Sequence, residues 1–139
     1  MGNKLRVVLD TNILLVSISS KSKYHWIFSN LLENKYELFI TNEVLLEYEE
    51  IISSRYSEEV AKDVIRTLLL LENVTLVTPF FKWGLINEDR DDNKFVDCYL
   101  ISNSDVLITN DKHFDVLKKI DFPKVNIVKI DMFEKIFFK

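Results

Sequence analysis

Residues 5–12, which read LRVVLDTN, decide the fold of this chain. The run up to Leu9 is apolar and shows little alternation, which is typical of a strand buried on both faces of a parallel sheet. Asp10 follows the run directly, and in open parallel sheets ligands bind beyond the carboxyl ends of the strands. An Asp at this place also suits the N-cap of a following helix, so its residue type alone supports both roles equally.

Outward from this strand, runs of β-branched and aliphatic residues alternate with helical patterns. We expect strands at 5–9, 36–40, 74–77, 106–108 and 125–130, and helices at 13–32 (broken near 19–22), 42–53, 57–71, 92–103, 112–119 and 132–138. This alternation over 139 residues predicts a single domain, 1–139, with a three-layer α/β/α sandwich around a mainly parallel central sheet.

The rare residue types exclude several classes of site. Cys98 is the one cysteine, which excludes a disulfide framework and multi-cysteine metal sites. With two glycines in the chain, a glycine-rich nucleotide loop cannot be written. The two histidines, His25 and His113, exclude a three-histidine metal cage, and we expect packing or surface roles for both.

Charge and hydropathy bound the environment of the protein. Its 22 acids against 18 lysines and arginines give a net charge of -4, which argues against coating nucleic acid by bulk attraction. The chain has no apolar run near the ~18 residues of a membrane helix, and its start lacks the apolar stretch of a signal peptide. We therefore expect a cytoplasmic protein without membrane contact.

Four acids are expected to converge at one edge of the sheet. Asp10 and Asp111 each follow a predicted strand, Asp92 begins the helix that leads into the fourth strand, and Glu47 lies at the margin of a buried helix face. Clustered carboxylates raise each other's pKa, so such a group is tolerated chiefly when divalent cations occupy it. Oxygen ligands favour Mg²⁺ or Mn²⁺.

Each of these acids has competitors or a simpler interpretation. Glu47 and Glu49 flank the apolar stripe of their helix symmetrically, so periodicity does not choose between them. Asp111 fits an ordinary turn. The place of the third acid is open to neighbours of Asp92, namely Asp89, Asp91 and Asp97.

At these positions the sequence resembles the PIN-domain nucleases. VLDTN at 8–12 resembles their opening strand motif, and TNEVLLEY at 41–48 resembles their second motif, whose acid falls on Glu47. DNKF at 92–95 and SDVLITND at 104–111 are similar to the third and fourth motifs and put the remaining acids at Asp92 and Asp111. The four motifs occur in order between residue 6 and about residue 117.

The resemblance extends to VapC-like toxins of toxin-antitoxin pairs. It implies a metal-dependent endoribonuclease, a phosphodiester hydrolase that uses Mg²⁺ or Mn²⁺ and a metal-activated water. It also implies an RNA substrate, a cognate antitoxin protein, and a homodimer or higher oligomer. The implied catalytic and metal-binding residues are Asp10, Glu47, Asp92 and Asp111, with Thr11, Asn12 and Thr109 supporting them.

Two other classes of function remain open. A degenerate acidic pocket would leave a catalytically inactive PIN-like RNA-binding or scaffold protein. An aspartyl phosphotransfer protein also uses an Asp at a strand end with Mg²⁺. That class needs a second acid near the first strand and a lysine at a later strand end, and neither Asp10-Thr11-Asn12 nor Thr109-Asn110-Asp111 provides them.

Overall fold

The computed structural model describes residues 4–80, 82–86 and 92–138 of the chain. Within these residues five strands form one sheet in the order β3-β2-β1-β4-β5, and every neighbouring pair is parallel. The carboxyl ends of the strands therefore share one edge of the sheet. The strands are β1 (Arg6–Leu9), β2 (Glu37–Ile40), β3 (Val74–Leu76), β4 (Val106–Ile108) and β5 (Ile127–Val128).

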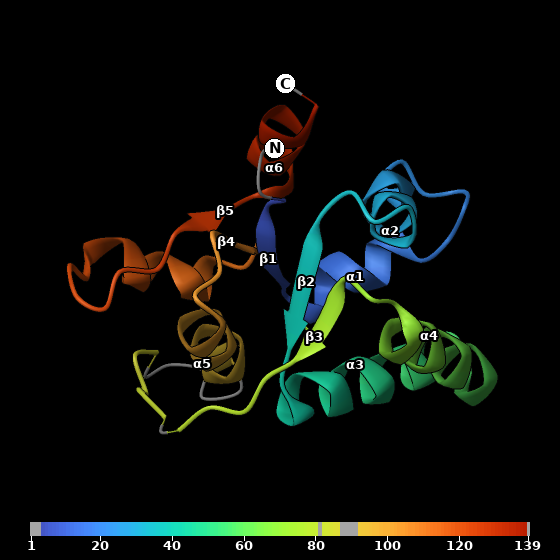
Figure 1. Cartoon of the computed structure of the whole chain (residues 1–139), viewed down its shortest axis with the longest axis horizontal. Helices are drawn as coiled ribbons and strands as arrows, with labels where there is room; N and C mark the ends of the chain where they lie inside the picture. The colour runs from blue at the N-terminus through green and yellow to red at the C-terminus, as the bar shows by residue number, and fades with distance from the viewer. Residues whose placement is uncertain (1–3, 81, 87–91, 139) are drawn as a thin grey trace.

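Helices cover both faces of this sheet, as Figure 1 shows. On one side lie α1 (Thr11–Ser17), α2 (His25–Leu32), α3 (Asn42–Arg55) and α4 (Glu58–Leu70). On the other side lie α5 (Asn93–Ser102) and the 3-10 helix η2 (Lys112–Lys119), and α6 (Ile130–Phe137) follows β5. The α/β/α sandwich with a parallel sheet is confirmed.

The central strand is buried as its sequence predicts. Val7, Val8 and Leu9 have no exposed surface, because helices pack on both faces of β1. The hydroxyl of Tyr48, a buried residue of α3, donates a hydrogen bond of 2.5 Å to the carbonyl oxygen of Leu9. This bond fixes α3 against the carboxyl end of β1 and thereby sets which face of the helix meets the sheet edge.

The break predicted near 19–22 in the helix at 13–32 is confirmed, because residues 18–24 separate α1 from α2. Serines cause the break, because their hydroxyls compete with helical carbonyls for backbone N–H groups. Ser19 Oγ accepts from the N–H of Lys21 at 3.2 Å, and Ser22 Oγ accepts from the N–H of Tyr24 at 3.1 Å.

One prediction of local structure was wrong in its extent. The strand expected at 125–130 is reduced to Ile127–Val128, because it pairs only with the short strand β4 and Ile130 already begins α6. The helix predicted at 112–119 is confirmed with these bounds, and it is a 3-10 helix.

No helix among the described residues has the length and the apolar character needed to span a lipid bilayer.

Candidate metal centre

Asp10 is the first residue after β1 and is 5% exposed. It occupies the N-cap position of α1, but its side chain makes no capping hydrogen bond to that helix. Its Oδ2 accepts instead from the hydroxyl of Thr109, at 2.8 Å, across the β1–β4 pairing. The carboxylate is thus turned toward β4. Its side chain therefore does not cap α1, which was one of the two roles that the sequence left open.

Thr109 connects Asp10 to Asp111. The hydroxyl of this buried threonine donates to Asp10 and accepts from the backbone N–H of Asp111 at 3.0 Å. Asp111 in turn caps η2, and its Oδ1 accepts from the N–H of His113 at 2.9 Å. One threonine therefore sets the position of both acids at the ends of the two central strands.

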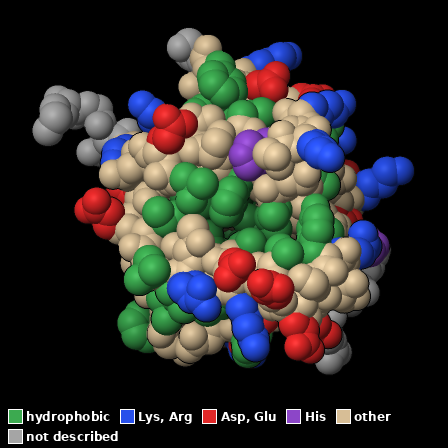
Figure 2. Space-filling model, turned by 90° about the vertical axis from the view of Figure 1, so that its right-hand side faces the viewer, with side chains coloured by type: hydrophobic (Ala, Val, Ile, Leu, Met, Phe, Trp, Pro, Cys, Tyr) green, Lys and Arg blue, Asp and Glu red, His purple; other side chains and the backbone are tan. Residues whose placement is uncertain are grey.

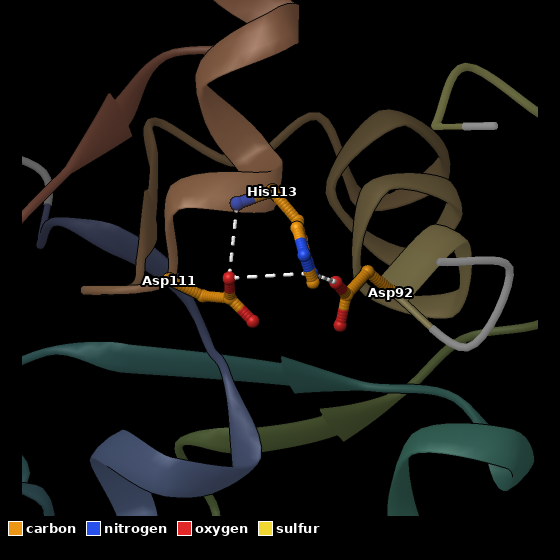
Figure 3. Close-up of side chains that lie close together, drawn as sticks. All are labelled: Asp92, Asp111 and His113. Atoms are coloured by element: carbon orange, nitrogen blue, oxygen red, sulfur yellow. Dashed lines mark hydrogen bonds and ion pairs between the residues drawn. The ribbon is translucent and has the colours of Figure 1, made fainter. Parts of the chain in front are cut away.

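Asp92, Asp111 and His113 form the group of side chains drawn in Figure 3. Nδ1 of His113 lies 3.6 Å from Oδ2 of Asp92 and 3.5 Å from Oδ1 of Asp111. One ligand atom from each of the three residues lies within 4.8 Å of the others, which is the spacing of ligands around a single cation. The group opens to solvent on the histidine side, since Asp92 is buried and the His113 side chain is 46% exposed.

Glu47 joins the cluster from α3. Its Oε2 accepts a short hydrogen bond from the hydroxyl of Thr11, the residue next to Asp10. Its Oε1 pairs with Nζ of Lys94 on α5 at 2.8 Å, and both side chains are largely buried. The four acids therefore form one network. Hydrogen bonds and ion pairs connect Asp10, Asp111 and Asp92 through Thr109 and His113. Glu47 connects to Asp10 through Thr11, the next residue in the chain.

The pKa of Asp10 is raised, mainly because the carboxyl group is buried. Burial raises the pKa of Asp10 from 3.8 to about 6, while the Thr109 hydroxyl and the Thr11 N–H oppose the rise. The negative charges of Asp111 and Glu47 raise this pKa further. A carboxylate in such surroundings gains from a nearby cation, because the cation offsets both desolvation and like-charge repulsion.

The structure separates most of the competing acids. Glu47 contacts the network, whereas Glu49 is exposed on the other side of the apolar stripe. Asp97 is buried elsewhere on α5, where its Oδ1 accepts from the N–H of Trp83 at 3.1 Å. Asp89 and Asp91 lie outside the described residues.

The three predicted supporting residues differ in burial and in their contacts with the acids. Thr11 and Thr109 are buried and bind the acids, as expected of supporting residues. Asn12 is exposed at the start of α1. The catalytic and metal-binding roles of the acids and of these three residues stay predictions.

His113 is the neighbour of the acids that sequence reasoning missed. Its signal was its position two residues after Asp111, in the first turn of the following helix. That turn brings the ring back over the carboxylate, because the N–H of His113 binds Oδ1 of Asp111. Hydrophobic periodicity carries no information on such an exposed polar side chain.

The donor set fits a hard or borderline divalent cation. Carboxylate oxygens suit Mg²⁺, Ca²⁺ and Mn²⁺, and one imidazole nitrogen extends the set toward transition metals. Asp92, Asp111 and His113 would hold the ion directly, with Asp10 and Glu47 completing the negative field around it.

Solved structures with the same fold are known. VapBC2 of Rickettsia felis, solved bound to a DNA fragment from its promoter, is similar with a TM-score of 0.63 at 18% identity, over 90% of this chain and 98% of that one. Mycobacterium tuberculosis VapC20, a sarcin-ricin loop cleaving toxin, gives a TM-score of 0.55 at 14% identity, over 73% and 86%. The PIN domain endonuclease Utp24 gives 0.55 at 21% identity, over 93% and 87%.

Comparison by sequence adds the family. Among curated proteins, none matches this chain. The sequence profile of the PIN domain matches residues 6–113, from the first residue of β1 to the histidine beside the acids. This range covers all four acids and most of the chain. The structural neighbours of the chain include VapC toxins of VapBC complexes. The chain belongs to the PIN-domain family.

Proposed function

We propose that this protein is a Mg²⁺- or Mn²⁺-dependent endoribonuclease, acting as one domain over residues 1–139 and serving as the toxin of a toxin-antitoxin pair. One observation carries the proposal above all. Acids from four separate segments, namely Asp10, Glu47, Asp92 and Asp111, meet at the carboxyl edge of the sheet in a single network. A purely structural role does not account for so many acids in one partly buried place.

The residues of the network divide the work. Asp92 and Asp111, with His113, would bind the cation at the solvent-facing side of the group, where a phosphate can reach it. When bound, the ion stabilises negative charge on a phosphodiester and promotes ionisation of water. Thr109 holds Asp10 and Asp111 in fixed relative positions, so that the carboxylates need no rearrangement.

Glu47 and Lys94 would help to position the substrate beside the metal centre. The ion pair between them holds the Glu47 carboxylate next to Thr11 and places the Lys94 ammonium group beside the acids. A lysine at this place can attract a phosphate that the acids alone would repel.

The test is cleavage of RNA by the purified chain with Mg²⁺, with Mn²⁺ and with chelator. We expect cleavage with either ion, none with chelator, and none for Asp10→Asn. The exposed acid Asp121, changed to Asn, serves as the matched control and should cleave like the parent. An RNA that is bound but left intact under every condition would instead establish the inactive RNA-binding alternative.

The proposed partner is an antitoxin protein. Figure 2 shows hydrophobic side chains gathered on the face of the molecule that lies on the right in Figure 1, with acids and bases around them. On that side, α2 and α4 expose Leu32, Leu69 and Leu70, the last at 78%. Apolar surface of this kind marks protein contacts, and several structural neighbours of this chain were solved as VapBC complexes.

The same face is the proposed contact of a homodimer or higher oligomer. Light scattering of the chain alone distinguishes a monomer from these assemblies. Leu70→Lys should dissociate an assembly built on this face, whereas an unchanged mass for that variant would contradict the assignment of the face.

A further inference from the structure

A cavity lies at the same edge of the sheet, next to the acid network. Its volume is about 310 Å³, and it lies at the carboxyl ends of β2 and β3. Its lining comes from the start of α3, from the segment after β3 and from α5, and includes Thr41, Glu43, Phe80, Lys82, Lys94 and Asp97.

The cavity and the acid network are neighbours. In the strand order β3-β2-β1-β4-β5, the network follows β1 and β4, and the cavity follows the adjacent strands β2 and β3. Lys94 belongs to both, because it lines the cavity and its Nζ lies 2.8 Å from Glu47. A polymer that binds at the acids can therefore extend along the carboxyl edge of the sheet into the cavity.

Phe80 gives the cavity an aromatic wall. This ring is 90% exposed, the largest exposed fraction among the large hydrophobic residues of the described chain. It contributes nothing to the core, so packing does not explain an aromatic residue there. A solvent-facing ring beside a mainly apolar cavity that also holds charged side chains can stack on a nucleobase.

Asp97 gives the cavity a buried hydrogen-bond acceptor. The side chain is 4% exposed, and Oδ1 accepts from the N–H of Trp83. An ionised carboxylate has about four acceptor positions, so one bond leaves capacity for further donors. A ligand that meets this group must present N–H or O–H donors.

We propose that this cavity binds one unpaired base of the RNA next to the cleaved phosphodiester, with Phe80 stacked on the base and Asp97 accepting from its Watson–Crick edge. The inference rests on the proposed function and names the substrate as single-stranded RNA. Guanine is the preferred base, since it alone presents two adjacent donors, N1–H and the 2-amino group, to a carboxylate.

Charge and size favour a base over a phosphate in this cavity. Glu43 and Asp97 oppose a second negative group, while Lys82 is paired with Glu43 at 2.8 Å. A volume of about 310 Å³ is at the lower end of ligand pockets, which suits one base and excludes a duplex.

The experiment measures binding without cleavage. In the Asp10→Asn background, fluorescence anisotropy gives the affinity for a short oligouridylate that carries one guanosine, and for the same RNA with inosine, which lacks the 2-amino group. Phe80→Ala should weaken the binding of the guanosine RNA about 5- to 100-fold, which is the effect of losing one base–aromatic stack. Phe80→Trp should restore the affinity. Phe138→Ala, an exposed aromatic at the end of α6, is the control and should bind like the background protein.

The second variant tests the acceptor. The background protein should prefer guanosine over inosine RNA by about 10-fold, as expected of one hydrogen bond to a charged group. Asp97→Asn should bind both RNAs alike. Equal affinities of Phe80→Ala and Phe138→Ala, or equal binding of guanosine and inosine RNA by the background protein, would overturn the inference.

Failure of the inference is distinct from failure of the proposed function. If the parent cleaves RNA in an Asp10-dependent manner while Phe80→Ala binds RNA normally, the cavity is not a base site and the nuclease proposal stands. If the chain neither cleaves nor binds RNA, both are wrong.

Discussion

Replacing Asp10 by Asn should make the metal-free protein more stable at neutral pH. The reason is the pKa of Asp10, which burial raises from 3.8 to about 6. The folded state thus holds the proton more tightly than the unfolded chain, so stability is greatest below pH 3.8 for this group and falls as the pH rises to about 6. Above that pH the ionised Asp10 costs the fold up to ~3 kcal/mol, at 1.36 kcal/mol for each pKa unit.

The amide that Asp10→Asn introduces carries no charge and can still accept from the Thr109 hydroxyl, so most of this cost should disappear. We expect the free energy of unfolding of Asp10→Asn to exceed that of the parent by ~1–3 kcal/mol at pH 7 and to equal it near pH 4. At 139 residues this is a rise in Tm of roughly 3–10 °C at pH 7. Urea denaturation with chelator across this pH range measures the difference.

Mg²⁺ should offset this difference in stability between the variant and the parent. A cation at 100 times its dissociation constant stabilises the parent by ~2.7 kcal/mol and should add little to the variant, which lacks a negative charge of the network. Asp121→Asn, at an exposed acid, is the control and should change stability by less than ~0.5 kcal/mol at every pH. Destabilisation of the fold by Asp10→Asn at pH 7, or an equal effect at pH 4 and pH 7, would refute a raised pKa at this position.

Three shorter predictions concern neighbours of the network. His113→Asn should weaken Mn²⁺ binding at least about 10-fold and Mg²⁺ binding less, because imidazole suits transition metals better. His25→Asn is the control and should change neither affinity. Titration calorimetry measures both affinities, and an unchanged Mn²⁺ affinity of His113→Asn would contradict a ligand role. Thr109→Val removes the hydroxyl that lowers the pKa of Asp10, so the pH above which Mg²⁺ raises the Tm should move upward, and an unmoved midpoint argues against the link. Tyr48→Phe should cost ~1–3 kcal/mol in urea denaturation, since a buried carbonyl at the end of β1 loses its donor, and a cost near zero would mean that this bond does not fix α3.

The fold could be predicted because its signals are local and strong. β1, β2 and β4 are runs of buried aliphatic residues, and Thr41 and Ser57 cap α3 and α4 through their side chains. The strand at 125–130 could not be predicted to its bounds, because its extent depends on how much of β4 is available to pair. Such a limit is set by another segment and leaves no trace in the sequence of the strand itself.

Part of the candidate site could also be predicted from local signals, and part could not. Acids at strand ends could be expected to meet, because parallel strands end at one edge. Hydrophobic periodicity could not choose Glu47 over Glu49, since the choice depends on the rotation of α3, which the bond from Tyr48 to Leu9 fixes. His113 escaped notice for a similar reason, because the contact of its ring with Asp92 requires η2 and α5 to lie together.

The pairing of β1 with β4 has a consequence for protein synthesis. The hydrogen bond between Thr109 and Asp10 joins residues 99 positions apart, and the strands that carry them are adjacent only in the finished sheet. A nascent chain whose fourth strand is still inside the ribosome holds Asp10 without Thr109 or Asp111. The emerging polypeptide therefore lacks the complete acid network, and under the proposed function it could not cleave the messenger that encodes it.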